Sequence, residues 1–249
     1  MPHEFEVREE ITLDATPEQV WEAIATGPGV DAWFMGSNEI EPRQGGRASM
    51  TMFGETSHST VAVWEPQKRL VTRSDASPDG IFMAFEYLIE GRDDGTTVLR
   101  FVHNGFLGDD WEAEYDALRK GDRAYLEKLA VYVRYFPGRT VTSKVFLPGP
   151  QVPDADRVWA AFGGALGLDG TPAAGDAARL TVDGLPPTEG VVETVRIPTF
   201  AITRTDDGYY MFMYGFHDTV VVEYDGFAKD PDTAQIEQAW QGWLARTFA

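Results

Sequence analysis

Three side chains in the first half of the chain could together perform acid–base chemistry: Tyr87, His103 and Asp122. Tyr87 and His103 belong to neighbouring segments, residues 81–90 and 97–103, whose patterns predict β-strands. Asp122 interrupts the apolar face of a helix predicted for residues 110–136. A histidine, a carboxyl group and a phenol in one pocket are the groups that general acid–base catalysis uses.

Two of these residues also have structural explanations that the sequence leaves open. His103 could be a partly buried, hydrogen-bonded histidine at the end of a strand. A helix break at Gly121 would turn Asp122 toward water. Without that break, a carboxylate without a partner on an apolar face would destabilise the fold or take up a proton.

Apolar side chains near these groups predict the lining of a pocket. Alternation along residues 81–90 puts Met83, Phe85, Tyr87 and Ile89 on one uncharged face, which we expect to point inward. The expected ligand-binding residues are Trp33, Phe34, Trp64, Met83, Phe85, Phe101, Tyr125 and Leu129. Of these, Trp33, Phe34 and Trp64 could line the mouth of a cavity or could simply be core.

Motifs for metals and common cofactors are missing from the sequence. There is no cysteine, and His3, His58, His103 and His217 are far apart, without H-x-x-H or H-E-x-x-H spacing. No P-loop, dinucleotide-binding or G-x-S-x-G motif occurs. The sequence therefore predicts neither a metal site nor a bound cofactor.

The charge of the chain argues against some partners. The 249 residues carry 40 acids and 21 bases, a net charge of −19, which repels phosphate backbones. We expect no nucleic-acid binding. Since no apolar run reaches the length of a membrane helix and the charged N-terminus has no signal-peptide pattern, we also expect no membrane span. The lack of cysteine fits a cytoplasmic location.

The same order of elements is predicted twice. A strand at residues 4–13 precedes a helix opened by Thr16-Pro17-Glu18, five strands between residues 48 and 103, and the long helix, which Pro137-Gly138 ends. After residue 140 come a strand, a helix, five further strands and a terminal helix. The two first helices even open alike, TPEQVWEAIAT and DADRVWAAFGGALGL. We therefore expect two tandem copies of one fold, residues 1–137 and a shortened second copy at 138–249.

Three stretches of the first half carry a family resemblance: AWFMGSNEIEPRQGGR, VAVWEPQKRLV and GDRAYLEKLAVYV. Together they resemble the SRPBCC (START-like, helix-grip) superfamily, in the branch named for the activator of the heat-shock-protein-90 ATPase. The resemblance implies an α+β fold in which a curved antiparallel sheet wraps around a long C-terminal helix, with an apolar cavity between them. Members bind lipids, sterols or polyketides, cyclise polyketides, or assist chaperones.

The expected function is the binding of an apolar or aromatic small molecule between the sheet and the helix. A cofactor-independent cyclase or dehydratase that uses His103, Tyr87 and Asp122 is the first alternative. A module that docks a protein partner or forms a homodimer is the second, and it predicts an exposed apolar patch in place of a usable cavity.

Overall fold

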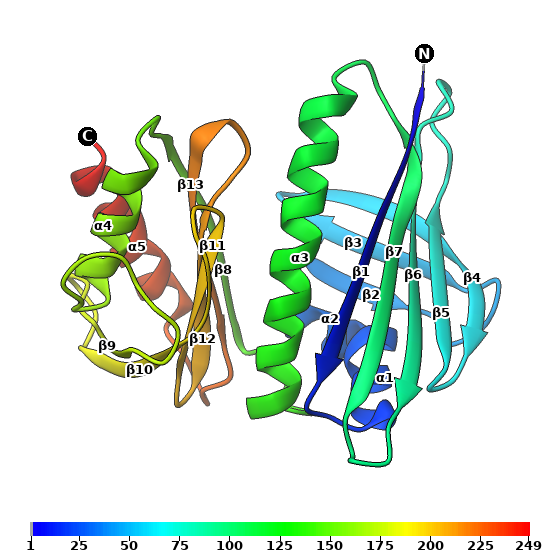
Figure 1. The fold of residues 1–249 in the computed structure, drawn as a ribbon, viewed down its shortest axis with the longest axis horizontal. Helices are drawn as coiled ribbons and strands as arrows, with labels where there is room; N and C mark the ends of the chain where they lie inside the picture. The colour runs from blue at the N-terminus through cyan, green and yellow to red at the C-terminus, as the bar shows by residue number, and fades with distance from the viewer. Residues whose placement is uncertain (1) are drawn as a thin grey trace. The chain divides into compact units, whose positions relative to one another are not determined.

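The computed structural model describes residues 2–249, apart from the side chain of Phe216. The chain forms two compact units, residues 1–140 and 141–249. Each contains one antiparallel sheet with helices on it, an α+β arrangement (Figure 1). No helix among the described residues is long and apolar enough to cross a membrane.

The sheet of the first unit has seven strands in the order β1-β7-β6-β5-β4-β3-β2. The first strand of the unit therefore pairs with the last, and the remaining strands follow as a meander. The strands are β1 (His3–Leu13), β2 (Ser37–Ile40), β3 (Arg47–Met52), β4 (Glu55–Glu65), β5 (Arg69–Ser74), β6 (Phe82–Gly91) and β7 (Thr97–Leu107).

Three helices accompany this sheet: α1 (Pro17–Ala25), α2 (Gly27–Asp31) and α3 (Trp111–Tyr135). The long helix α3 lies along one face of the sheet, and the sheet curves so that β2 and β3 pass behind it in the view of Figure 1. This is the helix-grip arrangement that the resemblance implied.

Local sequence explains where α1 begins. The Thr16 hydroxyl accepts a hydrogen bond from the Gln19 backbone N–H at 3.3 Å, and the Gln19 side chain accepts one from the Thr16 N–H at 2.9 Å. This capping box satisfies two N–H groups at the start of the helix. Pro17 occupies the first turn, as predicted from its fixed φ.

Two elements of the first unit were not predicted. Glycine and proline at positions 27–29 are typical of a helix end. Instead Thr26 caps a second short helix, α2, by accepting a hydrogen bond from the Gly29 N–H. The four-residue strand β2 also lacks a clear apolar alternation, so pairing with β3 rather than its own pattern defines it.

The second unit repeats the plan with one strand fewer. Its six-stranded sheet has the order β8-β13-β12-β11-β10-β9, so again the first strand pairs with the last. Its elements are β8 (Ser143–Gln151), α4 (Ala155–Ala165), β9 (Ala177–Leu180), β10 (Thr188–Arg196), β11 (Phe200–Thr205), β12 (Gly208–Tyr214), a short 3₁₀ turn (Phe216–Asp218), β13 (Thr219–Gly226) and α5 (Thr233–Thr247).

The interior of the second unit is filled by large rings. Trp159, Phe162, Phe212 and Trp240 are at most 1% exposed and belong to one core cluster. The centroids of the Phe162 and Phe212 rings are 4.8 Å apart, and those of Phe212 and Trp240 are 5.6 Å apart. Side chains from α4, β12 and α5 thus occupy the space between helix and sheet in this copy.

Candidate functional site

The inner face of the first sheet carries the predicted alternation. Phe85 lies opposite His103, and Tyr87 lies opposite Phe101, in the register of β6 with β7. Directly opposite residues of an antiparallel pair point to the same side. The ring contacts agree, because the centroids of Phe85 and His103 are 4.2 Å apart and those of Tyr87 and Phe101 are 5.2 Å apart.

His103 and Asp122 form a buried pair between β7 and α3. The Nδ1 atom of His103 lies 3.0 Å from Oδ2 and 3.2 Å from Oδ1 of Asp122. The His103 side chain is 1% exposed and the Asp122 side chain 10%. The strand and the helix thus bring together two residues that are 19 positions apart in the chain.

The helix-break alternative for Asp122 is wrong, whereas the hydrogen bond expected of a structural His103 is present. Helix α3 continues through Gly121, so Asp122 stays on the inner face and does not turn toward water. His103 lies inside β7, four residues before its end, and is fully buried rather than partly exposed. Gly121 lowers helix propensity by about 1 kcal/mol relative to alanine, which packing along the rest of a 25-residue helix outweighs.

Burial changes the acidity of the groups around this pair. It raises the pKa of the Asp122 carboxyl above the ordinary value of 3.8; the hydrogen bond with His103 opposes the rise, and the nearby Glu9 adds to it. Burial also raises the pKa of the Tyr87 hydroxyl, and the charge of Asp122 raises it further. Tyr87 therefore keeps its proton, while Asp122 is a weaker acid than a carboxyl in water.

Hydrogen bonding assigns the tautomer of His103. An ionised carboxylate only accepts hydrogen bonds, so Nδ1 must donate to Asp122 and carry the ring proton. The second nitrogen, Nε2, is buried and has no hydrogen-bond partner among the described residues. The rings of Phe5 and Phe85 contact the imidazole, with centroids 5.0 Å and 4.2 Å away. Nε2 is thus a buried acceptor in aromatic surroundings.

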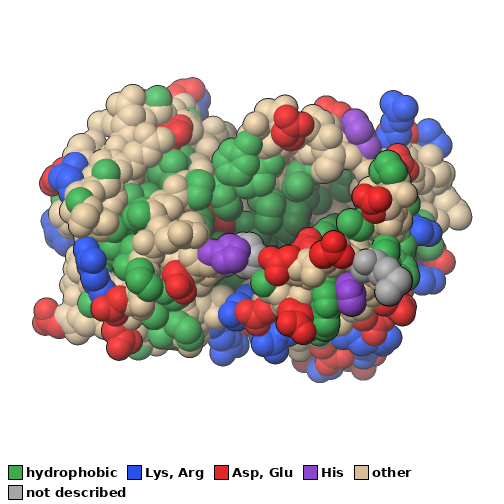
Figure 2. Space-filling model, turned by 90° about the horizontal axis from the view of Figure 1, so that it is seen from above, with side chains coloured by type: hydrophobic (Ala, Val, Ile, Leu, Met, Phe, Trp, Pro, Cys, Tyr) green, Lys and Arg blue, Asp and Glu red, His purple; other side chains and the backbone are tan. Residues whose placement is uncertain are grey.

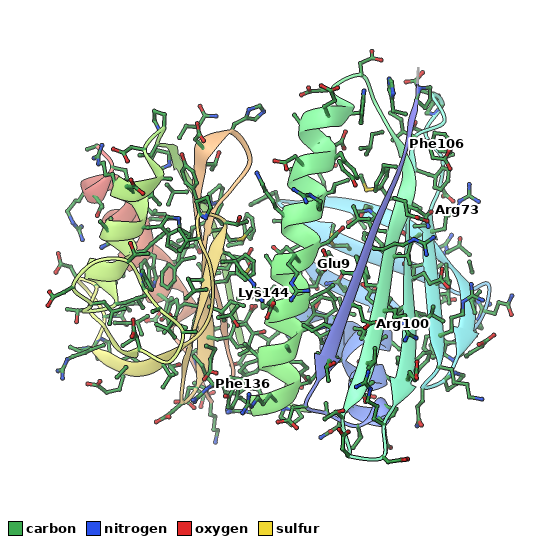
Figure 3. All side chains as sticks on the ribbon, viewed as in Figure 1. Glu9, Arg73, Arg100, Phe106, Phe136 and Lys144 are labelled. Atoms are coloured by element: carbon green, nitrogen blue, oxygen red, sulfur yellow. The ribbon has the colours of Figure 1, made fainter. Side chains whose placement is uncertain are left out.

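A second charged group on the inner face escaped the sequence prediction. Arg123 of α3 donates hydrogen bonds to Glu9 of β1 at 3.1 Å and to Glu127 one helical turn later. Glu9 lies between β1 and α3 (Figure 3). Its position opposite the inward-facing Phe101 was the available signal, but the strand pairing had to be known first.

The apolar residues predicted to bind ligand divide into two groups. Trp33, Phe101, Tyr125 and Leu129 are at most 4% exposed and pack as core. Trp33 even donates its indole N–H to the carbonyl of Ala23 at 2.9 Å. Trp33 is therefore placed as a core residue, which was the alternative to lining a cavity mouth.

The other predicted lining residues are half-buried although they face the interior: Phe34, Trp64, Met83 and Phe85. The Phe34 ring packs edge-on against Tyr125 with centroids 4.9 Å apart, and Trp64 packs against Trp21 at the same distance. Tyr87 is likewise half-buried. These five side chains, Phe34, Trp64, Met83, Phe85 and Tyr87, are called the lining set below.

Helix α3 shows where this interior is open. Its fully buried residues all lie between Ala124 and Val133, whereas Trp111, Tyr115 and Leu118 on the preceding turns are half-buried. Figure 2 looks at the end of the unit where α3 begins and shows a hollow lined by hydrophobic side chains. The hollow therefore opens beside the first turns of α3.

No metal site accompanies these groups in the part of the chain that the structure describes. No three His, Asp or Glu side chains gather there as ligands for an ion. The polar groups described above pair with one another instead, as His103 with Asp122 and Arg123 with Glu9 and Glu127.

Comparison with known proteins finds a family model that matches part of the chain. Residues 14–134 match the model of the Activator of Hsp90 ATPase homolog 1-like protein family. Similar solved structures include a protein from Mesorhizobium loti (21% identity, TM-score 0.47, covering 53% of this chain and 98% of that one) and a protein from Bacillus halodurans (22%, 0.46, 53% and 99%).

A third structure spans both units. The di-domain ARO/CYC BexL is 16% identical with a TM-score of 0.47, and the match covers 98% of this chain and 91% of that one. No curated protein matches the chain significantly. The match to the model of activator of Hsp90 ATPase homolog 1-like proteins therefore lies within the first unit of the chain.

Proposed function

We propose that the first unit binds an apolar or aromatic small molecule between the inner face of its sheet and helix α3. The observation that carries the proposal is the half-burial of the lining set on a face that points into the unit. In a close-packed interior such rings would have no accessible surface. A concave, mostly apolar hollow with few polar groups is typical of small-molecule sites.

Phe85 provides the test of this site. Replacing it with tryptophan adds ring volume to the hollow, so Phe85→Trp should weaken ligand binding at least tenfold without unfolding the unit. The ligand is first identified by comparing native and denaturing mass spectra of freshly purified protein and extracting any mass that is lost. Naphthalene, followed by ligand-detected NMR, serves as the probe if no mass is found.

The matched control is Phe82→Trp in the same strand. Phe82 lies on the opposite face of β6, where Arg73 sits over its ring at 4.0 Å. The same added volume there should leave binding unchanged. Equal binding by the wild type and Phe85→Trp, with both proteins folded by circular dichroism, would place the ligand elsewhere.

An acid–base enzyme is the second candidate, and the His103–Asp122 pair favours it. A carboxylate that fixes the tautomer of a histidine leaves Nε2 free to take a proton from a bound molecule. Tyr87, still protonated, could donate a hydrogen bond to a developing oxyanion. This arrangement suits a cyclase or dehydratase that needs no cofactor.

A generic proton-transfer substrate tests the enzyme reading. In 5-nitrobenzisoxazole a base removes the C3 proton, the electron pair forms a nitrile, and the N–O bond breaks to release a phenolate. A catalytic His103 predicts turnover above a solution-histidine background that falls at least tenfold in Asp122→Asn. A rate equal to that background would favour a binding protein.

A protein-docking role has less support in the described residues. The large apolar side chains that are well exposed are Phe53 after β3, Leu88 on the outer face of β6 and Ile197 in the second unit. They come from three separate elements. Single exposed apolar residues are normal on protein surfaces and do not make a docking patch.

A further inference from the structure

The unused nitrogen of His103 sets a chemical requirement on whatever occupies the hollow. The imidazole is 1% exposed, and Nε2 lacks a hydrogen-bond partner among residues 2–249. Buried polar atoms in folded proteins almost always have a partner. A ligand atom is the natural partner in a hollow that is otherwise lined by apolar side chains.

The polarity of that missing hydrogen bond follows from the other nitrogen. Nδ1 donates to the Asp122 carboxylate, so a second ring proton would have to be carried by Nε2. The phenyl rings of Phe5 and Phe85 offer no acceptor for a second ring proton. The ligand atom that meets Nε2 must therefore donate, as a hydroxyl or N–H group does.

Charge restricts the ligand further. The Asp122 carboxylate lies directly beside the imidazole, and Glu9 of β1 is close enough for its charge to raise the pKa of Asp122. Arg123 is already engaged by Glu9 and Glu127. An ionised carboxylate on a ligand would have no proton to donate to Nε2 and would meet the charge of Asp122 in a poorly solvated space.

The neighbours of His103 define the shape of the ligand next to it. Phe85 lies against the imidazole, and Phe101 and Tyr87 continue the aromatic surface along β7 and β6. Aromatic rings pack well by offset stacking or edge contacts. A flat, apolar body beside the donor group matches this surface better than a flexible chain.

We propose that the ligand is a neutral aromatic alcohol or phenol whose hydroxyl donates a hydrogen bond to Nε2 of His103, and that the site rejects anions such as carboxylated lipids. This inference rests on the proposed small-molecule site and specifies its selectivity. His103 then determines specificity by accepting a hydrogen bond, whether or not it also moves a proton.

Four probes of one shape separate the proposal from the site on which it rests: naphthalene, 2-methoxynaphthalene, 2-naphthol and 2-naphthoate. Their dissociation constants are measured by ligand-detected NMR on the full chain. 2-Naphthol should bind about three- to tenfold more tightly than 2-methoxynaphthalene, which has the oxygen but no donor. 2-Naphthoate should bind most weakly.

Two variants show whether His103 causes the preference for 2-naphthol over 2-methoxynaphthalene. In His103→Phe, which keeps an aromatic ring, the ratio between 2-naphthol and 2-methoxynaphthalene should fall to about one while naphthalene still binds. Arg100→Gln, on the outer face of the same strand and exposed, is the matched control and should keep the wild-type ratio. If His103→Phe does not fold, ¹⁵N NMR of the wild type gives the answer, because 2-naphthol should shift Nε2 as a hydrogen-bond acceptor.

The outcomes distinguish the two proposals. If none of the probes binds, the small-molecule site itself is refuted. If naphthalene binds but 2-naphthol gains nothing over 2-methoxynaphthalene, or 2-naphthoate binds best, the site stands and the donor requirement is refuted. A proton on Nε2 of His103 in the free protein would also refute the donor requirement.

Discussion

Asp122 is the residue whose burial has the clearest thermodynamic consequence. Its pKa is raised above 3.8 in the folded unit, mainly by loss of solvent. The folded chain therefore binds this proton more readily than the unfolded chain does. By linkage, the contribution of Asp122 to the free energy of unfolding is largest at low pH and falls as the pH rises through and above about 4.

Replacing Asp122 with asparagine should remove that pH dependence. The difference in unfolding free energy between the wild type and Asp122→Asn should decrease as the pH rises from about 3.5 toward neutrality. Urea unfolding at a series of pH values measures it. A difference that is flat or increases with pH would show that the pKa of Asp122 is not raised.

Asp116 provides a control of opposite sign on the same helix. Its exposed carboxylate pairs with Lys120, which lowers its pKa. The wild type should therefore lose stability relative to Asp116→Asn as the pH falls through the pKa of this group. Opposite trends for the two variants would separate burial from ion pairing as the cause of each shift.

At the scale of elements, the sequence predicted the long helix and most of the meander well. Alternating apolar residues in β6 and the three- and four-residue spacing in α3 are strong local signals, and both elements lie where they were expected. Thr16 and Pro17 predicted the start of α1 equally well. Local signals of this kind require no knowledge of the rest of the fold.

What could not be predicted depended on contacts between distant segments. In the sequence, Glu9 is one of several charged residues in a strand whose apolar alternation is imperfect. Only the pairing of β1 with β7 places it on the inner face. Similarly, Gly121 suggested a break in α3, because the sequence does not show how much packing holds the helix together. The half-burial of the lining set also depends on where α3 crosses the sheet.

Gly121 allows a test of the helix itself. An alanine Cβ at this position would meet nothing within 4 Å. Alanine also has a higher helix propensity, so Gly121→Ala should raise the free energy of unfolding by about 0.5–1 kcal/mol. Urea unfolding at constant pH measures the change.

Gly163 in α4 is the matched control. A Cβ there would collide with the backbone of Gly170, so the same substitution should destabilise the protein despite the better propensity of alanine. If Gly121→Ala also lowered stability, the helix would have to be distorted at that turn.

For the whole molecule, the two copies use the same strand order in different ways. The first keeps a hollow beside the first turns of α3, whereas Trp159, Phe162 and Trp240 fill the corresponding space of the second. The pairing of the strands defines the helix-grip fold, so the fold forms with either interior. The aromatic side chains between helix and sheet decide whether a hollow remains there. The repeat in the sequence therefore predicts two folds but not two sites.

The pairing of the first strand with the last has a consequence for synthesis on the ribosome. Leu13 of β1 finds its partner Thr97 only when β7 emerges. At typical elongation rates β1 waits unpaired for on the order of 4 to 17 seconds. Its exposed edge needs protection from aggregation during that time, and the charges along HEFEVREEITL, which recur at almost every second residue, provide it by repulsion.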